Sequence, residues 1–168
     1  MGEAFTIWLH LFAVAVWIGP QVFMFVGALP ATREVLDEGV RLRVLRVLTT
    51  RFGYLGWGAM VVIVMTGISN VFQVSDEFDG VFDPDFRYMY IFTAKMIVLA
   101  VALTFTAMHT FDVGPAQLRL MEAGGDPAEV ARLRRLSVVS SSLGLLGSLG
   151  VLFAGALLAN HDYSFQSF

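Results

Sequence analysis

The sequence predicts an all-α integral membrane protein: an antiparallel four-helix bundle with four transmembrane helices and a short cytoplasmic interfacial helix. Three observations favour this class. The first two are that 57% of the 168 residues are hydrophobic and that the mean hydropathy is +0.71. The third is a set of four apolar stretches, each long enough to cross a hydrocarbon core of about 30 Å. A soluble domain of this length would carry fewer apolar and more charged residues. We therefore expect one membrane domain over residues 1–168.

Charged loops separate the apolar stretches and set their boundaries. The expected spans are residues 5–29, 52–72, 88–111 and 137–159, and residues 33–49 suit an amphipathic helix on the membrane surface. Five arginines lie within residues 31–51, four more lie between the third and fourth spans, and five carboxylates lie between the second and third. Loops rich in arginine stay in the cytoplasm. The pattern therefore predicts a multi-pass protein of the cytoplasmic (inner) cell membrane with both termini outside.

Composition also limits the partners. The chain has no cysteine, which excludes disulfides, thiolate metal sites and covalently attached haem. The net charge is -3 and the arginines form no stripe, so we expect no nucleic acid partner. Membrane lipids are expected around all four spans. Rows of glycine and serine in the fourth span allow close packing, either within the chain or in a homodimer.

A single lysine lies inside the third span. An ammonium group at the depth of Lys95 costs about 3 kcal/mol on insertion scales, so we expect a functional interaction that offsets this cost. His109 follows fourteen residues later, on nearly the same helix face and about 21 Å further along the axis. In the first span, His10 and Trp17 are seven residues apart and share a face. Polar groups of three kinds are therefore expected inside the membrane.

The predicted topology sorts these residues by depth. His10 and Lys95 each lie about 7 Å inside the outer boundary of their spans. His161 is nearer the outer surface, whereas His109 is close to the cytoplasmic surface at a depth similar to that of Met24. Two candidate sites follow, an outer one and an inner one.

Each of these residues also has a structural interpretation. Lys95 can extend its side chain to the outer interface, and His10 can be a hydrogen-bonded packing residue. His109 and His161 lie near the interfaces, where histidine costs little. Methionines within the spans, Met24 among them, are ordinary apolar filling. We favour a functional role for Lys95 and His10 and leave the other two histidines open.

Three segments taken together resemble a known family. They read WLHLFAVAVWIGPQVFMF, RFGYLGWGAMVVIVMTGI and YMYIFTAKMIVLAVALTFTAMH. Their order and spacing are similar to those of the copper resistance D domain family, and of the related HemJ-type protoporphyrinogen oxidases, over about residues 5–119. In the HemJ branch a histidine of the first helix and a lysine of the third are the functional pair, and they correspond to His10 and Lys95. Haem b binding is what this resemblance implies.

Three classes of function follow. We favour a haem b protein, an oxidoreductase in electron transfer or porphyrin oxidation with a redox partner, because ligation by histidine, methionine or lysine needs no covalent link. The first alternative is a copper-handling or copper-transport protein, which would need several ligands at one depth. The second alternative is an assembly subunit without a cofactor.

Under the haem hypothesis the residues divide between the two sites. His10 is the expected iron ligand of the outer site, with Trp17 on the same face and His161 as the alternative ligand. Lys95 is the catalytic candidate, because it can ligate the iron as a neutral amine or pair with a haem propionate. His109 belongs to the separate inner site. Under the copper hypothesis the metal ligands are His10 and His161.

Overall fold

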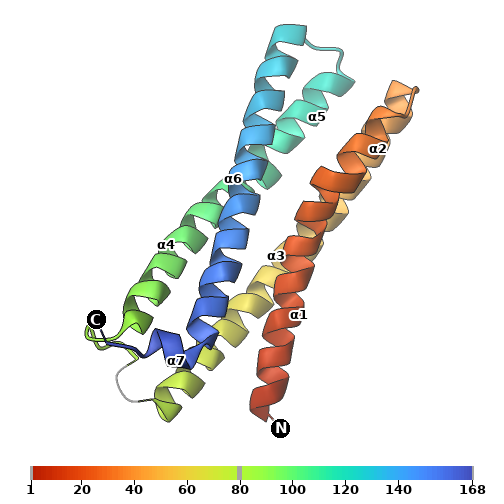
Figure 1. The fold of residues 1–168 in the computed structure, drawn as a ribbon. Coiled ribbons are helices and arrows are strands. Elements are labelled where there is room, and N and C mark those ends of the chain that lie inside the picture. Colours follow the sequence, from red (N-terminus) through yellow and green to blue (C-terminus); the bar gives the residue numbers. More distant parts are fainter. Residues whose placement is uncertain (1, 79–80, 168) are drawn as a thin grey trace.

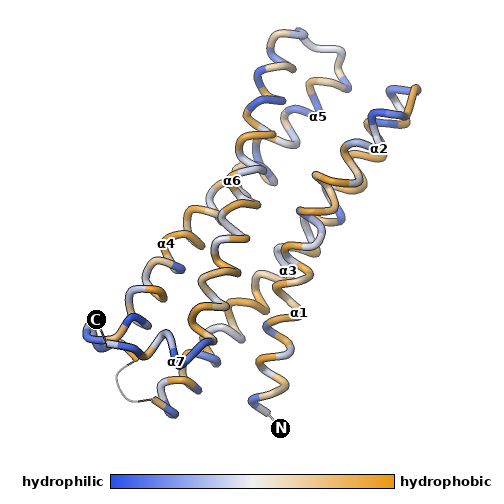
Figure 2. The backbone as a smooth tube through the Cα atoms, in the orientation of Figure 1, coloured by the Kyte–Doolittle hydropathy of each residue, from blue (hydrophilic) through white to orange (hydrophobic). Residues whose placement is uncertain are grey.

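The computed structural model describes residues 2–78 and 81–167. Within these residues, four helical stretches are long and apolar enough to cross a membrane, which confirms the all-α membrane bundle. Figure 1 shows both termini at one end of the bundle and α2 and α5 at the other. We call these the outer end and the cytoplasmic end, after the predicted topology. Figure 2 shows apolar residues along the middle of the rods and hydrophilic residues toward both ends.

The first and third stretches share one construction. The first consists of α1 (Gly2–Phe23), the π-helix η1 (Met24–Ala28) and α2 (Leu29–Arg33). The third consists of α4 (Arg87–Ala107), the π-helix η2 (Met108–Val113) and α5 (Gly114–Glu122). Each π-helix ends two residues before a proline, Pro30 or Pro115. Proline lacks an N–H and its ring crowds the carbonyl four residues earlier, so we attribute the widened turns to these prolines.

The second and fourth stretches are single long helices. They are α3 (Glu38–Glu77) and α6 (Pro127–Ala159), and the short α7 (His161–Ser164) follows α6. An aspartate caps each long helix: Asp37 accepts a hydrogen bond from the Val40 N–H at 2.9 Å, and Asp126 accepts one from the Ala128 N–H at 3.3 Å. Both caps satisfy backbone donors that would otherwise lack partners.

The structure corrects the prediction of a separate interfacial helix over residues 33–49. The first helical stretch ends at Arg33. The capped helix that begins at Glu38 then continues through the second span without interruption. No proline occurs between Asp37 and Glu77, and the arginines, leucines and valines before the span are compatible with a continuing helix. Residues 38–49 are therefore a cytoplasmic extension of α3.

The four rods form two antiparallel pairs. α1 packs along α3 and α4 packs along α6, whereas contacts between the two pairs are fewer. A small core joins the pairs, in which Trp17, Ala59 and Met60 pack against Leu99 and Leu103. Many large apolar side chains on the outer faces of the rods are exposed, as expected where lipid takes the place of water.

Small residues of α6 face α4. A Cβ added at Gly147 would lie 2.7 Å from the Cβ of Ala102, and one added at Gly144 would lie 2.6 Å from Oγ1 of Thr106. Ser140, one turn before Gly144, is completely buried. This row of small residues is therefore used for packing within the chain, where it lets two backbones approach closely.

Candidate functional site

His10 is held from α1 against α3 in one orientation. Its Nδ1 lies 2.8 Å from Oγ1 of Thr66, and that hydroxyl donates its own proton to the carbonyl of Val62 at 2.6 Å. A threonine hydroxyl has one proton, so toward His10 it acts as the acceptor and the imidazole donates from Nδ1. The other ring nitrogen, Nε2, therefore carries the lone pair that can bind a metal or accept a proton.

Glycine makes room for the His10 ring. A Cβ added at Gly67, the residue after Thr66, would lie 3.3 Å from Cε1 of His10. Contact that close would require the ring to move by a few tenths of an ångström. The Thr66-Gly67 pair therefore fixes the imidazole through the hydroxyl of one residue and the missing side chain of the other.

Lys95 lies across the bundle from His10. His10 and Lys95 are near enough to interact electrostatically, and Nζ of Lys95 is 3.7 Å from where a Cβ at Gly155 of α6 would be. His10 precedes Pro30 by twenty positions and Lys95 precedes Pro115 by the same number, which indicates a similar depth. The structure thus brings together the two residues predicted for the outer site.

Among the described residues, no anionic side chain compensates Lys95. In residues 2–78 and 81–167 its amine makes no hydrogen bond and no ion pair. A cation inside a membrane requires a partner or must give up its charge. The site is therefore suited to a ligand that supplies either a carboxylate or an electron-pair acceptor.

Trp17 forms the inner side of this region. Its indole Nε1 donates to Oγ of Ser148 at 3.1 Å, which is a buried hydrogen bond between the two helix pairs. Ser148 in turn donates to the carbonyl of Gly144 at 2.9 Å. The six-membered part of the indole lies 3.4 Å from where a Cβ at Gly56 would be. Trp17 is thus fixed on the same face as His10, two turns further in.

The structure does not bring His161 to His10. His161 belongs to α7 and contacts two aromatic rings, with ring centroids 4.7 Å apart for Phe78 and 5.8 Å apart for Phe165. Phe78 follows Gly67 by eleven residues, which is about 16 Å along a helix. His161 is therefore part of an aromatic cluster at the outer end, well away from the His10 ring.

The predicted inner residues lie in the two π-helices. His109 is in η2, with its Nδ1 3.3 Å from Oγ of Ser137 of α6. Met24 is the first residue of η1, in the other helix pair, and both residues precede their proline by six positions. His109 lies about 21 Å along the rod from Lys95, so the inner residues are separate from the outer site.

Sequence reasoning missed the hydroxyl partners of the aromatic and imidazole groups. Thr66, Ser148 and Ser137 bind His10, Trp17 and His109 respectively. The signal that could have revealed them is the presence of hydroxyl residues within apolar spans. Sequence spacing alone does not show which hydroxyl faces which ring.

Some buried polar atoms of the described residues have no partner. They are Nε1 of Trp57, Oδ1 of Asn70 and Oγ1 of Thr106. Asn70 is one helical turn beyond Thr66, so the two residues lie on the same face of α3. A buried acceptor without a donor calls for a ligand or an ordered water.

Comparison with known families shows to which family the chain belongs. The model of the family described as copper resistance protein D matches residues 46–158. The chain belongs to the copper resistance protein D family. No curated protein and no solved structure matches it significantly. The matched segment contains Lys95 but begins within α3, so His10 and Trp17 of α1 lie outside it.

The family identifies a membrane protein related to copper resistance. Among the described residues no group of three or more histidine, cysteine, aspartate or glutamate side chains is placed to hold a metal ion. The relationship to HemJ-type proteins stays a prediction. The ligand atoms that the outer site offers, such as Nε2 of His10, determine whether it suits haem or copper better.

Proposed function

We propose that the outer site binds haem b and that the chain is a redox protein, acting in electron transfer or in porphyrin oxidation with a redox partner. The observation that carries this proposal is the hydrogen bond between Nδ1 of His10 and the Thr66 hydroxyl. Imidazoles that bind metals usually donate their second N–H to such a partner, which fixes the ring. Bound haem would supply one-electron chemistry at its iron.

The donors at this depth suit haem better than a bare metal ion. One imidazole is enough for an axial ligand, whereas a protein copper site usually needs several ligands. Lys95 lacks a carboxylate partner in the described part of the chain, and haem carries two propionates. The missing side chains of Gly67 and Gly155 make room for the His10 ring and the Lys95 amine themselves.

Each residue of the outer site then has a defined task. His10 would hold the iron through Nε2, and the Thr66 hydroxyl on Nδ1 would keep the ring in the required tautomer. Trp17, anchored by Ser148, bounds the site on its inner side. Lys95 would hold a propionate as a cation or the iron as a neutral amine, and it could exchange a proton with a bound porphyrin.

The remaining histidines keep secondary roles in the proposal. His161 would be an alternative ligand only if α7 moved, because it now contacts Phe78 about 16 Å from Gly67. His109, with Ser137 on its Nδ1, has the same arrangement of ring and hydroxyl as His10. It is therefore the candidate ligand of a second, inner haem.

A second candidate function is copper handling, which the family match favours. In that case copper is the substrate, and Nε2 of His10 would be a transient ligand beside Lys95. The described residues offer no cluster of ligands that would retain the ion. Such a site would suit brief contact during transfer more than storage.

Absorption spectroscopy and metal analysis of the purified chain separate these functions. The haem proposal predicts a Soret band, sharp α and β bands after reduction, and about one iron per chain if only the outer site is filled. A colourless protein that retains copper would establish the copper function instead. A chain with neither metal, even after incubation with haem and with cuprous ion, would leave the cofactor-free assembly role.

A further inference from the structure

The two helix pairs repeat one construction. In each pair an α-helix, a π-helix and a short α-helix form the first rod, and a long capped helix forms the second. The connectors between the rods, residues 34–37 and 123–126, have equal lengths, and both end with the capping aspartate. Pro30 and Pro115, each the second residue of its short helix, are 85 positions apart. The two pairs are therefore two versions of one helical hairpin.

The residues of the outer site occupy matching positions in the two hairpins. Lys95 follows His10 by 85 positions, the same separation as that of the two prolines. Six residues of α3 recur in α6 at a separation of 88 positions: Leu45, Arg46, Leu48, Leu55, Gly56 and Gly67. Gly67 therefore matches Gly155, and a Cβ at these glycines would lie 3.3 Å from Cε1 of His10 and 3.7 Å from Nζ of Lys95. Each hairpin thus places one nitrogen-bearing side chain against the same glycine of its long helix.

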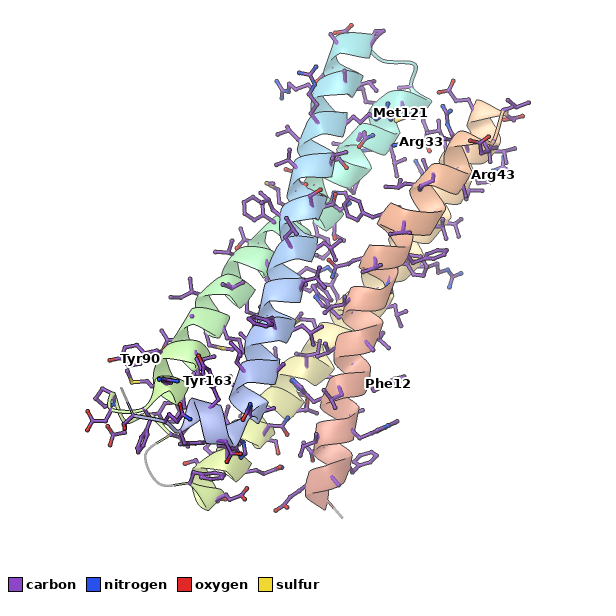
Figure 3. The ribbon with its side chains drawn as sticks, in the orientation of Figure 1. Phe12, Arg33, Arg43, Tyr90, Met121 and Tyr163 are labelled. Atoms are coloured by element: carbon purple, nitrogen blue, oxygen red, sulfur yellow. The ribbon has the colours of Figure 1, made fainter. Side chains whose placement is uncertain are left out.

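The two hairpins are arranged about an approximate twofold axis along the bundle. α1 contacts α6, and α3 contacts α5, which continues α4. Each of these contacts is the other with the hairpins exchanged, as a twofold axis requires. Figure 1 shows α1 and α4 on opposite sides of the outer end with α6 between them, and Figure 3 shows Phe12 of α1 and Tyr90 of α4 on these two sides. His10 and Lys95, which interact electrostatically, therefore approach the axis from opposite sides.

The neighbours of the two residues differ in a way that follows from their chemistry. Thr66 precedes Gly67 and fixes the His10 ring through its hydroxyl, whereas Ala154 precedes Gly155 and has no hydroxyl. An imidazole ligand has a second ring nitrogen that needs a partner to orient the ring. An amine ligand has no ring to orient. The exchange of threonine for alanine therefore accompanies the exchange of histidine for lysine, as expected for two positions that both serve as ligands.

We propose that His10 and Lys95 bind one metal centre on this axis from opposite sides, so that Nζ of Lys95 is the second axial ligand of the outer haem and not the partner of a propionate. This assignment rests on the proposed haem function. Nε2 of His10 has a free lone pair, because Nδ1 donates to Thr66. The Lys95 ammonium gains a lone pair by releasing one proton to the outer aqueous phase. Binding to iron then removes a charge that no described carboxylate compensates.

The test is the spin state of haem in the full-length chain, measured by absorption and electron paramagnetic resonance. The wild-type chain should hold six-coordinate, low-spin haem. Lys95→Met should give five-coordinate, high-spin haem, whereas Lys95→His should stay six-coordinate and low-spin. The matched control is Lys95→Met/Met96→His, which places an imidazole on the next residue of α4, a side chain that is 37% exposed. This control should stay five-coordinate, because Met96 does not match the position of His10.

The position that matches Thr66 gives a second readout. Adding Ala154→Thr to Lys95→His supplies the hydroxyl that the new imidazole lacks, and it should raise the haem affinity about tenfold. In the wild-type chain Ala154→Thr should leave the haem affinity unchanged, since the amine of Lys95 has no ring to orient. Haem titration followed by absorbance measures both affinities. An equal effect of Ala154→Thr in the two backgrounds would contradict the match between Ala154 and Thr66.

The outcomes separate the ligand assignment from the haem function. Haem that is high-spin in the wild-type chain, or that stays low-spin in Lys95→Met, would overturn Lys95 as a ligand while leaving the haem function intact. A wild-type chain that binds cuprous ion in place of haem, and loses it in both His10→Ala and Lys95→Met, would reject haem but keep the paired donors. A wild-type chain that binds neither haem nor cuprous ion would overturn both proposals.

Discussion

Gly144 and Gly147 of the α4–α6 pair face small side chains, whereas Gly56 and Gly67 of the α1–α3 pair face rings. In the first pair a Cβ at Gly147 would overlap Ala102 at 2.7 Å. In the second pair, Cβ atoms at Gly56 and Gly67 would lie 3.4 and 3.3 Å from the rings of Trp17 and His10. Glycine therefore brings two backbones together in one pair and provides a surface for functional rings in the other.

The α4–α6 pair is specialised for close helix packing, and the α1–α3 pair carries the side chains that can bind a ligand. Close approach of α4 and α6 makes that pair a rigid support, from which Lys95 extends beside Gly155. The α1–α3 pair carries the oriented imidazole and the anchored indole, and it joins the other pair through the Trp17–Ser148 hydrogen bond. Substitutions at Gly144 and Gly147 of the first pair should act mainly on stability, and those at Gly56 and Gly67 of the second pair mainly on ligand binding.

Gly147→Ala should give the largest loss of stability. The new methyl group cannot be accommodated without separating α4 from α6, and we expect a cost of about 2 kcal/mol. Gly58→Ala is the matched control, since a Cβ there would meet nothing within 4 Å, and it should be neutral or slightly stabilising. Thermal unfolding in detergent measures both, and equal effects would contradict the assignment of α4–α6 as the tightly packed pair.

Ser148→Ala tests the hydrogen bond that joins the pairs. It leaves Nε1 of Trp17 buried without an acceptor, which should cost about 1 kcal/mol. The control is a double-mutant cycle with Trp17→Phe, in which Ser148→Ala should cost little once the indole donor is gone. Additive losses of unfolding free energy would show that the two groups do not interact.

Lys95→Met tests whether the rigid pair contributes to the chemistry. It removes an uncompensated amine from a span, so the free energy of unfolding should be unchanged or slightly higher. Some haem should remain, with a changed reduction potential or lost activity, because His10 is still present. Reduction potential and turnover measure this effect, and wild-type values for both would remove Lys95 from the site.

Gly67→Ala should have a small effect on stability and a selective effect on binding. The added methyl pushes Cε1 of His10 by a few tenths of an ångström, while the backbone is unaffected. We expect a several-fold weaker haem affinity with a change in Tm of no more than about 3 °C. Haem titration followed by absorbance measures the affinity. An unchanged affinity would mean that the ring does not need its present position.

Hydropathy predicted the spans because a membrane helix needs a continuous apolar run, and residue spacing predicted that His10 and Lys95 share a depth. The continuity of α3 was not predictable, since a pattern of arginine with leucine and valine suits either a surface helix or an extended span. The partners Thr66 and Ser148 depend on helix rotation, which small residues set through packing. His161 was misplaced relative to His10 because α7 turns it into an aromatic cluster.

The most direct test of the central claim is the absorption spectrum of His10→Ala beside the wild-type chain, with His161→Ala as the matched control. The account predicts that His10→Ala loses the Soret band of the outer haem and that added imidazole restores part of it. His161→Ala should keep the wild-type spectrum, because His161 packs against Phe78 and Phe165 in the aromatic cluster and not against the His10 ring. Full haem occupancy with an unchanged spectrum in His10→Ala would contradict the claim that His10 is the iron ligand.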